Sequence, residues 1–193
     1  MIVMDSDAVV VVSGLPRSGT SMLMKMLDAG GITPLTDRER EADLDNPRGY
    51  YEFERVKKLP HDAGWLDEAR GKSVKVLAEL VKHLPDGYHY KVVFMQRRIP
   101  EIIRSQKKML IRRGEDPEKV SDGEMELLLR RYLKLMKSYI GGKDNMEVLF
   151  VSYNDILSHP RREVNAINRF FGGFLDEESM VSVVDEGLYR NRV

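Results

Sequence analysis

Residues 14–21 have the glycine spacing of a phosphate-binding loop. The stretch reads GLPRSGTS, and its glycines match the pattern glycine, four residues, glycine, lysine, then serine or threonine. Thr20 stands where the pattern has lysine, and Arg17 lies inside the loop. The backbone N–H groups of such a loop, with the start of a following helix, bind an anion. The arginine adds a permanent charge and a planar set of donors that suit a tetrahedral oxyanion.

The missing lysine argues against ATP hydrolysis, because in nucleotide-hydrolysing enzymes that lysine contacts the β- and γ-phosphates. In addition, no apolar strand pattern ends directly in an aspartate that would hold magnesium. We keep a magnesium-dependent nucleotide kinase or NTPase as one alternative function. A non-catalytic nucleotide-binding or partner-binding protein on the same fold is another, since a fold alone does not prove a function.

The stretch LPRSGTS after an apolar segment resembles the 5′-phosphosulfate loop of sulfotransferases that use 3′-phosphoadenosine 5′-phosphosulfate (PAPS). The arginine form is most similar to tyrosylprotein sulfotransferases and related bacterial sulfotransferases. The resemblance implies that Arg17 stabilises charge on the bridging oxygen as its bond to sulfur breaks. The resemblance also implies that the sulfuryl group is transferred without the help of a metal ion. The residues that it places around the 5′-phosphate and the sulfuryl group are Arg17, Ser18, Gly19, Thr20 and Ser21.

A second segment, KVVFMQRRIPEIIRS, is similar to the part of sulfotransferases that binds the 3′-phosphate. The family has an arginine at the end of a strand and a serine eight residues later, which here are Arg97 and Ser105. Two helical turns bring such a hydroxyl back along one side. The family's Arg-Asp-Pro reads RRIP here, so we expect the helix to approach differently. The alternative is an ordinary basic amphipathic helix, since other basic residues surround the pair: Arg98, Arg104, Lys107 and Lys108.

Residues 148–172 are similar to a third sulfotransferase segment, in which a strand, Tyr-Glu-Asp-Leu, a proline and a helix follow one another. The resemblance places Tyr153 near the adenine, and a residue that caps the core is the alternative. The C-terminal Gly-x-x-Gly-x-x-Lys segment of cytosolic sulfotransferases has no counterpart here. Arg190 and Arg192 are candidates to replace it at the 3′-phosphate, without a spacing argument for either.

Sulfuryl transfer needs a base that takes a proton from the acceptor hydroxyl or amine. The Lys-Thr-His segment of cytosolic sulfotransferases reads Lys75-Val76-Leu77 here, which removes the histidine and leaves Lys75 as a contact for the transferring group. Tyrosylprotein sulfotransferases use a glutamate after the first helix, and we favour Glu52 in the stretch DNPRGYYEFE. The other candidates are the remaining acids of this segment: Glu39, Glu41, Asp43, Asp45 and Glu54.

The elements that must position these residues alternate between strand and helix patterns. The alternation predicts an α/β fold, with a parallel sheet between two layers of helices, which the resemblance makes a P-loop-like sulfotransferase fold in one domain over 1–193. Ligands in such sheets bind at the carboxyl ends of strands. We expect strands at 8–13, 73–76, 90–95 and 147–151. We expect helices at 20–29, 51–60, 79–84, 99–113, 121–140 (with a capping box at Ser121 and Glu124), from 160 to about 171, and at 176–185.

The composition suits a cytoplasmic enzyme. The chain has 193 residues, no cysteine and a formal net charge of zero, so overall charge supplies no attraction to nucleic acid. No apolar run approaches the ~18 residues of a membrane span. The expected partners are the PAPS donor, the PAP product and an acceptor whose identity the sequence leaves open. Its pocket is expected between loop 31–49 and helix 121–140, which also has apolar surface for a core or a homodimer. Aromatic candidates for its walls, or for the core instead, are Tyr50, Tyr51 and Trp65.

Overall fold

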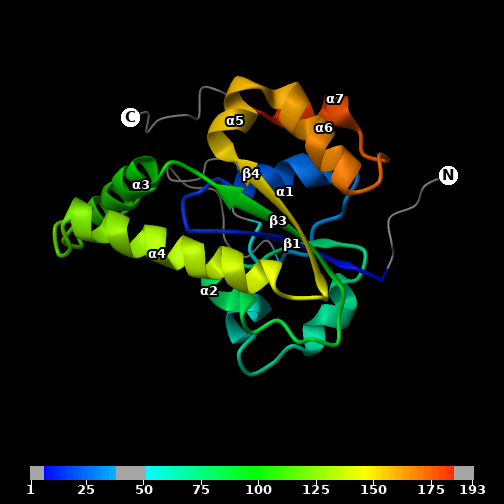
Figure 1. Cartoon of the computed structure of the whole chain (residues 1–193), viewed down its shortest axis with the longest axis horizontal. Coiled ribbons are helices and arrows are strands. Elements are labelled where there is room, and N and C mark those ends of the chain that lie inside the picture. Colours follow the sequence, from blue (N-terminus) through cyan, green and yellow to red (C-terminus); the bar gives the residue numbers. More distant parts are fainter. Residues whose placement is uncertain (1–6, 38–50, 185–193) are drawn as a thin grey trace.

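The computed structural model describes residues 7–37 and 51–184, which contain a four-stranded sheet (Figure 1). Its strands are β1 (Val9–Gly14), β2 (Ser73–Lys75), β3 (Tyr90–Gln96) and β4 (Met146–Ser152). They pair in the order β2-β1-β3-β4, and every pair is parallel. The carboxyl ends of all four strands therefore meet at one edge of the sheet, as the sequence predicts.

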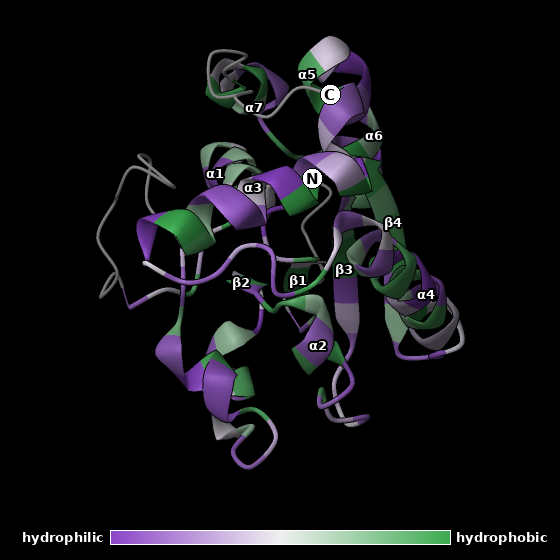
Figure 2. Ribbon diagram, turned by 90° about the vertical axis from the view of Figure 1, so that its left-hand side faces the viewer, coloured by the Kyte–Doolittle hydropathy of each residue, from purple (hydrophilic) through white to green (hydrophobic). Residues whose placement is uncertain are grey.

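The sheet is covered on both faces. Helices α1 (Thr20–Ala29), α5 (Tyr153–Ser158), α6 (Pro160–Phe170) and α7 (Glu177–Val183) lie on one side of it in Figure 1. The other side carries α2 (Ala78–Val81), α4 (Asp122–Gly141) and two 3₁₀ helices, η1 (Glu54–Lys58) and η2 (Gly64–Ala69). In Figure 2 the strands again lie between these two groups of helices. The predicted three-layer α/β fold is confirmed.

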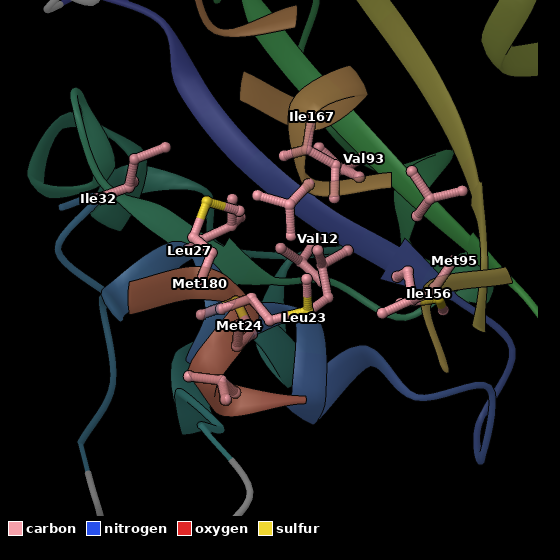
Figure 3. Close-up of a cluster of buried hydrophobic side chains, with 14 of the residues drawn as sticks. Val12, Leu23, Met24, Leu27, Ile32, Val93, Met95, Ile156, Ile167 and Met180 are labelled. Atoms are coloured by element: carbon pink, nitrogen blue, oxygen red, sulfur yellow. The ribbon is translucent and has the colours of Figure 1, made fainter. Parts of the chain in front are cut away.

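Alternation along β1 divides the hydrophobic core in two. Val10 and Val12 point into the cluster with α1, α5, α6 and α7, whereas Val9 and Val11 point into the cluster with η1, η2, α2 and α4. All six residues of β1 are buried, as expected for a parallel strand with both faces covered. Figure 3 shows the first cluster, in which Leu23 of α1 packs near Val12. This packing fixes α1 to the sheet, and with it the loop that joins β1 to α1.

Several sequence predictions hold to within a residue or two. Helix α1 has the predicted bounds, and the capping box of α4 is present, with the Ser121 hydroxyl and the Glu124 carboxylate each accepting the other's backbone N–H. Helix α3 (Ile99–Arg112) also agrees with its prediction. None of the helices in the described part of the chain combines the length and apolar character that a bilayer span requires.

Other elements differ from the predictions. The predicted helix at 51–60 is the shorter η1, and the sequence analysis missed η2 and α5. The apolar surface predicted for helix 121–140 is only partly buried in α4: Met136 and Ile140 lie in the core, but Leu128 is exposed. The amino-terminal part of α4 extends past the sheet and lies beside α3 (Figure 1). The apolar side chains of this part therefore cannot pack against the sheet.

We expect Leu23→Ala to lower the free energy of unfolding by about 2–5 kcal/mol, because it leaves a cavity between α1 and the sheet. The matched control is Leu135→Ala on α4, where the side chain is 69% exposed and the Leu23 side chain is fully buried. The control should change stability by less than about 0.5 kcal/mol. Urea unfolding of both variants measures this, and equal losses would contradict the packing of α1 described above.

Candidate active site

The loop between β1 and α1 has a backbone that only glycine permits at two positions. Gly14 ends β1 with φ 149°, and Gly19 precedes α1 with φ 103°. A Cβ atom added to Gly14 would lie 2.6 Å from the carbonyl oxygen of Met95 on β3, and one on Gly19 would lie 2.4 Å from the Tyr153 ring. The glycine spacing noted in the sequence is therefore required by close packing of the loop on β3 and on the end of β4.

Arg17 lies at the centre of the candidate site. Its Nε donates a hydrogen bond to the Ser105 hydroxyl of α3 at 2.9 Å, and its carbonyl oxygen accepts one from Nη1 of Arg97 at 3.2 Å. The backbone φ of Arg17, 70°, lies in the left-handed region, which residues other than glycine rarely adopt. The structure thus brings together the three residues that the sequence assigns to the two ends of one nucleotide. Arg97 and Ser105 both reach the loop.

Arg97 follows β3 and is surrounded by groups that hold its guanidinium. Its Nε donates to Oε2 of Glu101 at 2.8 Å, and the guanidinium carbon lies 4.3 Å from the centre of the Tyr153 ring. Tyr153 follows β4, whose residues pair with β3 up to Gln96 and Ser152, so the next residue of each strand is a neighbour. The sequence analysis missed Glu101, which lies four positions after Arg97; Arg97 precedes α3, so the pairing rule for two residues of one helix did not point to it.

Tyr153 is buried against Gly19 and Arg97. This packing supports the loop, in agreement with the structural alternative for this residue. Its contact with adenine stays a prediction.

Lys75 and Glu52 lie on the other side of the loop. Lys75 ends β2 with a side chain only 6% exposed, and its Nζ is 3.4 Å from the Ser21 hydroxyl and 3.7 Å from Oε1 of Glu52. The Glu52 side chain is 22% exposed. The structure therefore places a partly exposed carboxylate and a buried ammonium next to the first turn of α1, where the sequence predicts the sulfuryl group.

The remaining candidates for a base are less well placed or lie outside the described residues. Glu54 forms an ion pair with Lys57 on the exposed side of η1. The acids outside the described residues are Glu39, Glu41, Asp43 and Asp45. Among the described acids that the sequence analysis considered, Glu52 lies beside Lys75, the lysine that contacts the loop at Ser21, and its role as the base stays a prediction.

The aromatic residues proposed for an acceptor pocket have different positions. Trp65 is fully buried in the second core cluster, where it meets Phe53 edge to face at 5.6 Å, so the core interpretation holds. The Tyr51 hydroxyl donates to Asp28 of α1 at 3.3 Å, and Tyr51 packs against the first cluster. Tyr50, Arg190 and Arg192 lie outside the described residues.

An open groove of about 660 Å³ adjoins Arg97, between the end of β3 and α4. Its walls come from the β3–α3 junction and from one side of α4, and basic side chains predominate among them. The lining residues are Gln96, Arg97, Arg98, Ile99, Pro100, Arg130, Leu133, Lys134 and Lys137. In a chain of zero net charge, this makes the edge of the sheet locally electropositive.

A parallel sheet with a glycine-bounded loop between β1 and α1, and basic side chains at the ends of neighbouring strands, is the architecture of phosphate-loop proteins. Within that class, the chain matches the model of the sulfotransferase domain family over residues 7–191, and it belongs to this family. A comparison with curated protein sequences found no match. The family predicted from the loop and its companion segments is therefore confirmed, and the reaction class is that of a sulfotransferase.

Solved sulfotransferase structures share the fold. One from Mycobacterium tuberculosis H37Rv has a TM-score of 0.58 and 17% identity, over 92% of this chain and 70% of that one. The sulfotransferase domain of the Synechococcus PCC 7002 olefin synthase has a TM-score of 0.55 and 16% identity, over 99% of this chain and 85% of that one. A sulfotransferase from Alicyclobacillus acidocaldarius has a TM-score of 0.51 and 14% identity, over 88% of this chain and 84% of that one. Because all are below 25% identity, they support the fold and not the acceptor.

We expect Gly19→Ala to destabilise the protein more than Gly31→Ala. The two glycines have nearly the same φ, 103° and 105°, but a Cβ at Gly31 meets nothing within 4 Å whereas one at Gly19 meets Tyr153. Backbone strain is therefore similar, and the excess loss, about 1–3 kcal/mol, measures overpacking against the ring. Urea unfolding of both variants tests this. Equal losses would mean that Tyr153 does not press on the loop.

Proposed function

We propose that this protein transfers the sulfuryl group of PAPS to a hydroxyl or amine of an acceptor and releases 3′,5′-ADP (PAP). The observation that carries the proposal is the position of Arg17, which contacts both Arg97 and Ser105 from within the loop. An adenosine nucleotide with phosphates at both ends needs two oxyanion sites on neighbouring strands, and β1 and β3 are neighbours.

The loop suits the 5′ end of this donor. Helix α1 begins at Thr20, directly after the loop, and among the described residues no side chain caps it and no acidic residue lies in its first turn. The first N–H groups of a helix then offer hydrogen bonds and a partial positive charge to an anion. The hydroxyl of Ser18 is buried in the loop without a hydrogen-bond partner in the described structure. After a small rotation of its side chain, the Ser18 hydroxyl could donate a hydrogen bond to a phosphate oxygen close to the loop.

The donor's 5′-phosphate and sulfuryl group would contact Arg17, Ser18, Gly19, Thr20 and Ser21. Arg97 and Ser105 would receive the 3′-phosphate, and Tyr153 would lie on the adenine side. In this arrangement Lys75, whose ammonium already contacts Ser21, would face the transferring group.

The reaction follows from these positions. Glu52 accepts the proton of the acceptor hydroxyl or amine, whose lone pair attacks sulfur opposite the bridging oxygen. The sulfur–oxygen bond to the 5′-phosphate breaks, and its electron pair stays on the phosphate oxygen of the departing 3′,5′-ADP. Arg17 and Lys75 stabilise the charge that develops there, a contribution of about 3–4 kcal/mol per donor in other enzymes. The proton stays on the Glu52 carboxylate, which is partly exposed and returns it to solvent after the products leave.

Nucleotide binding tests the donor. We expect 3′,5′-ADP at 100 times its dissociation constant to stabilise the protein by about 2.7 kcal/mol, and to stabilise it more than 5′-AMP does at the same concentration. Arg97→Ala should remove most of this stabilisation. Its control is Arg98→Ala, since the neighbouring Arg98 side chain is 63% exposed and the Arg97 side chain 7%. Thermal unfolding measures both variants. Stabilisation by ATP with magnesium, and none by 3′,5′-ADP, would support a kinase or NTPase instead.

Substitution of the proposed base tests the mechanism. We expect Glu52→Gln to lower turnover by about 10²–10⁴-fold, because the amide cannot accept the acceptor's proton, while 3′,5′-ADP still binds. The matched control is Glu54→Gln, which alters an exposed carboxylate two residues away. The measurement is release of 3′,5′-ADP from PAPS with a model phenol or amine that the unmodified protein accepts. Unchanged turnover in Glu52→Gln would exclude Glu52 as the base.

A further inference from the structure

Glu101 is a buried carboxylate with no part in the reaction described above. Its side chain is 0% exposed, and both of its oxygens accept hydrogen bonds: Oε2 from Nε of Arg97 at 2.8 Å, and Oε1 from Nδ2 of Asn154 at 2.9 Å. Burying a charge is costly unless it is paired and hydrogen-bonded. A buried ion pair contributes little to stability beyond that cost, which makes another role for this pair worth testing.

The two side chains that donate these hydrogen bonds to Glu101 come from different parts of the edge of the sheet. Arg97 begins the connection from β3 to α3, and Asn154 lies in the first turn of α5, directly after β4. The Asn154 side chain also accepts a hydrogen bond from the backbone N–H of Arg98 at 3.3 Å. Glu101 and Asn154 therefore fix the two strand ends to each other and set the direction of the Arg97 guanidinium.

That direction matters because Arg97 also holds the loop. Its Nη1 donates to the carbonyl oxygen of Arg17, the residue with φ 70°. A residue other than glycine keeps such a conformation only when its surroundings determine it. Here the surroundings include the bond from Arg97 to the Arg17 backbone and the bond from the Arg17 side chain to Ser105.

We propose that Glu101 is a positioning residue for the donor loop, acting through Arg97 on the backbone of Arg17. It orients the guanidinium of Arg97, and that guanidinium holds the Arg17 carbonyl in the arrangement that presents the loop to the 5′-phosphate. The inference rests on the proposed function, since the loop that Glu101 positions is the proposed donor loop. It assigns Arg97 a second role besides the 3′-phosphate.

The variant Glu101→Gln separates this role from simple neutralisation of Arg97. If Glu101 only offsets the charge of Arg97, the neutral amide strengthens the attraction of Arg97 for a 3′-phosphate. Affinity for 3′,5′-ADP then rises, and affinity for 5′-AMP, which lacks that phosphate, stays the same. If Glu101 positions the loop, both nucleotides lose affinity, because both place a 5′-phosphate in it.

We expect about a tenfold loss for both nucleotides in Glu101→Gln, the scale on which partners of a binding residue act in metal sites. Calorimetric titration of the full chain with each nucleotide, well below the unfolding temperature, measures it. A purely structural role would lower the unfolding temperature and leave both affinities unchanged, which would overturn the proposal. A gain for 3′,5′-ADP alone would overturn it too.

A second variant keeps the test decisive if Glu101→Gln does not fold. Asn154→Ala removes the hydrogen bond from Asn154 to Glu101 and leaves the Arg97–Glu101 pair in place, so a smaller loss of affinity is expected, again shared by both nucleotides. Asn165→Ala is the matched control, because its exposed amide donates to the partly buried Glu177 at 3.2 Å, away from the loop. Equal affinities in Asn154→Ala and the unmodified protein would count against the proposal.

The failure of the proposed function would look different. If the unmodified protein bound neither nucleotide, the donor assignment itself would be wrong, and the positioning role would fall with it. If the unmodified protein bound 3′,5′-ADP and the variants bound it with the same affinity, only the role of Glu101 would be rejected.

Discussion

The hydrogen bond from Arg97 to the carbonyl oxygen of Arg17 is the interaction on which the site depends. It joins the end of β3 to a loop whose backbone is held in an unfavourable conformation. Around it, Tyr153 packs against Gly19, and Ser105 receives the Arg17 side chain. The carboxyl ends of β1, β3 and β4 are thus connected through side chains as well as through the sheet, which gives the anion-binding groups a defined geometry before any ligand arrives.

Two cations of the site, Arg97 and Lys75, lie beside carboxylates. Arg97 is paired with the buried Glu101, and Lys75 lies 3.7 Å from the partly exposed Glu52. Pairing lowers the cost of keeping a charge away from water and fixes the direction in which its donors point. The two pairs differ in what a reactant can reach: the Glu52 carboxylate is partly open to solvent, whereas the Glu101 carboxylate is enclosed. This difference suits a proton acceptor in the first pair and an anchor in the second.

Much of the fold could be predicted because its signals are local. The valine run of β1, the glycines around the loop and the capping box at Ser121 each specify a conformation within a few residues. Helix α5 and the 3₁₀ helix η2 escaped prediction because they are short. The exposure of Leu128 also escaped prediction, because periodicity indicates which side of a helix is apolar but not how far the sheet extends beneath it.

The sequence by itself determined that Arg17, Arg97 and Ser105 belong to one edge of a parallel sheet, because parallel strands bring the loops at their carboxyl ends together. The resemblance of the stretch LPRSGTS and of two further segments to sulfotransferases also predicted the family. Only the tertiary structure decided which side chains pair across that edge: Glu101 with Arg97 and Asn154, and Lys75 with Glu52. Those pairs depend on the register of β3 against β4 and on the return of residue 52 to the end of β2. Both are relations between segments far apart in the chain, which local sequence patterns do not encode.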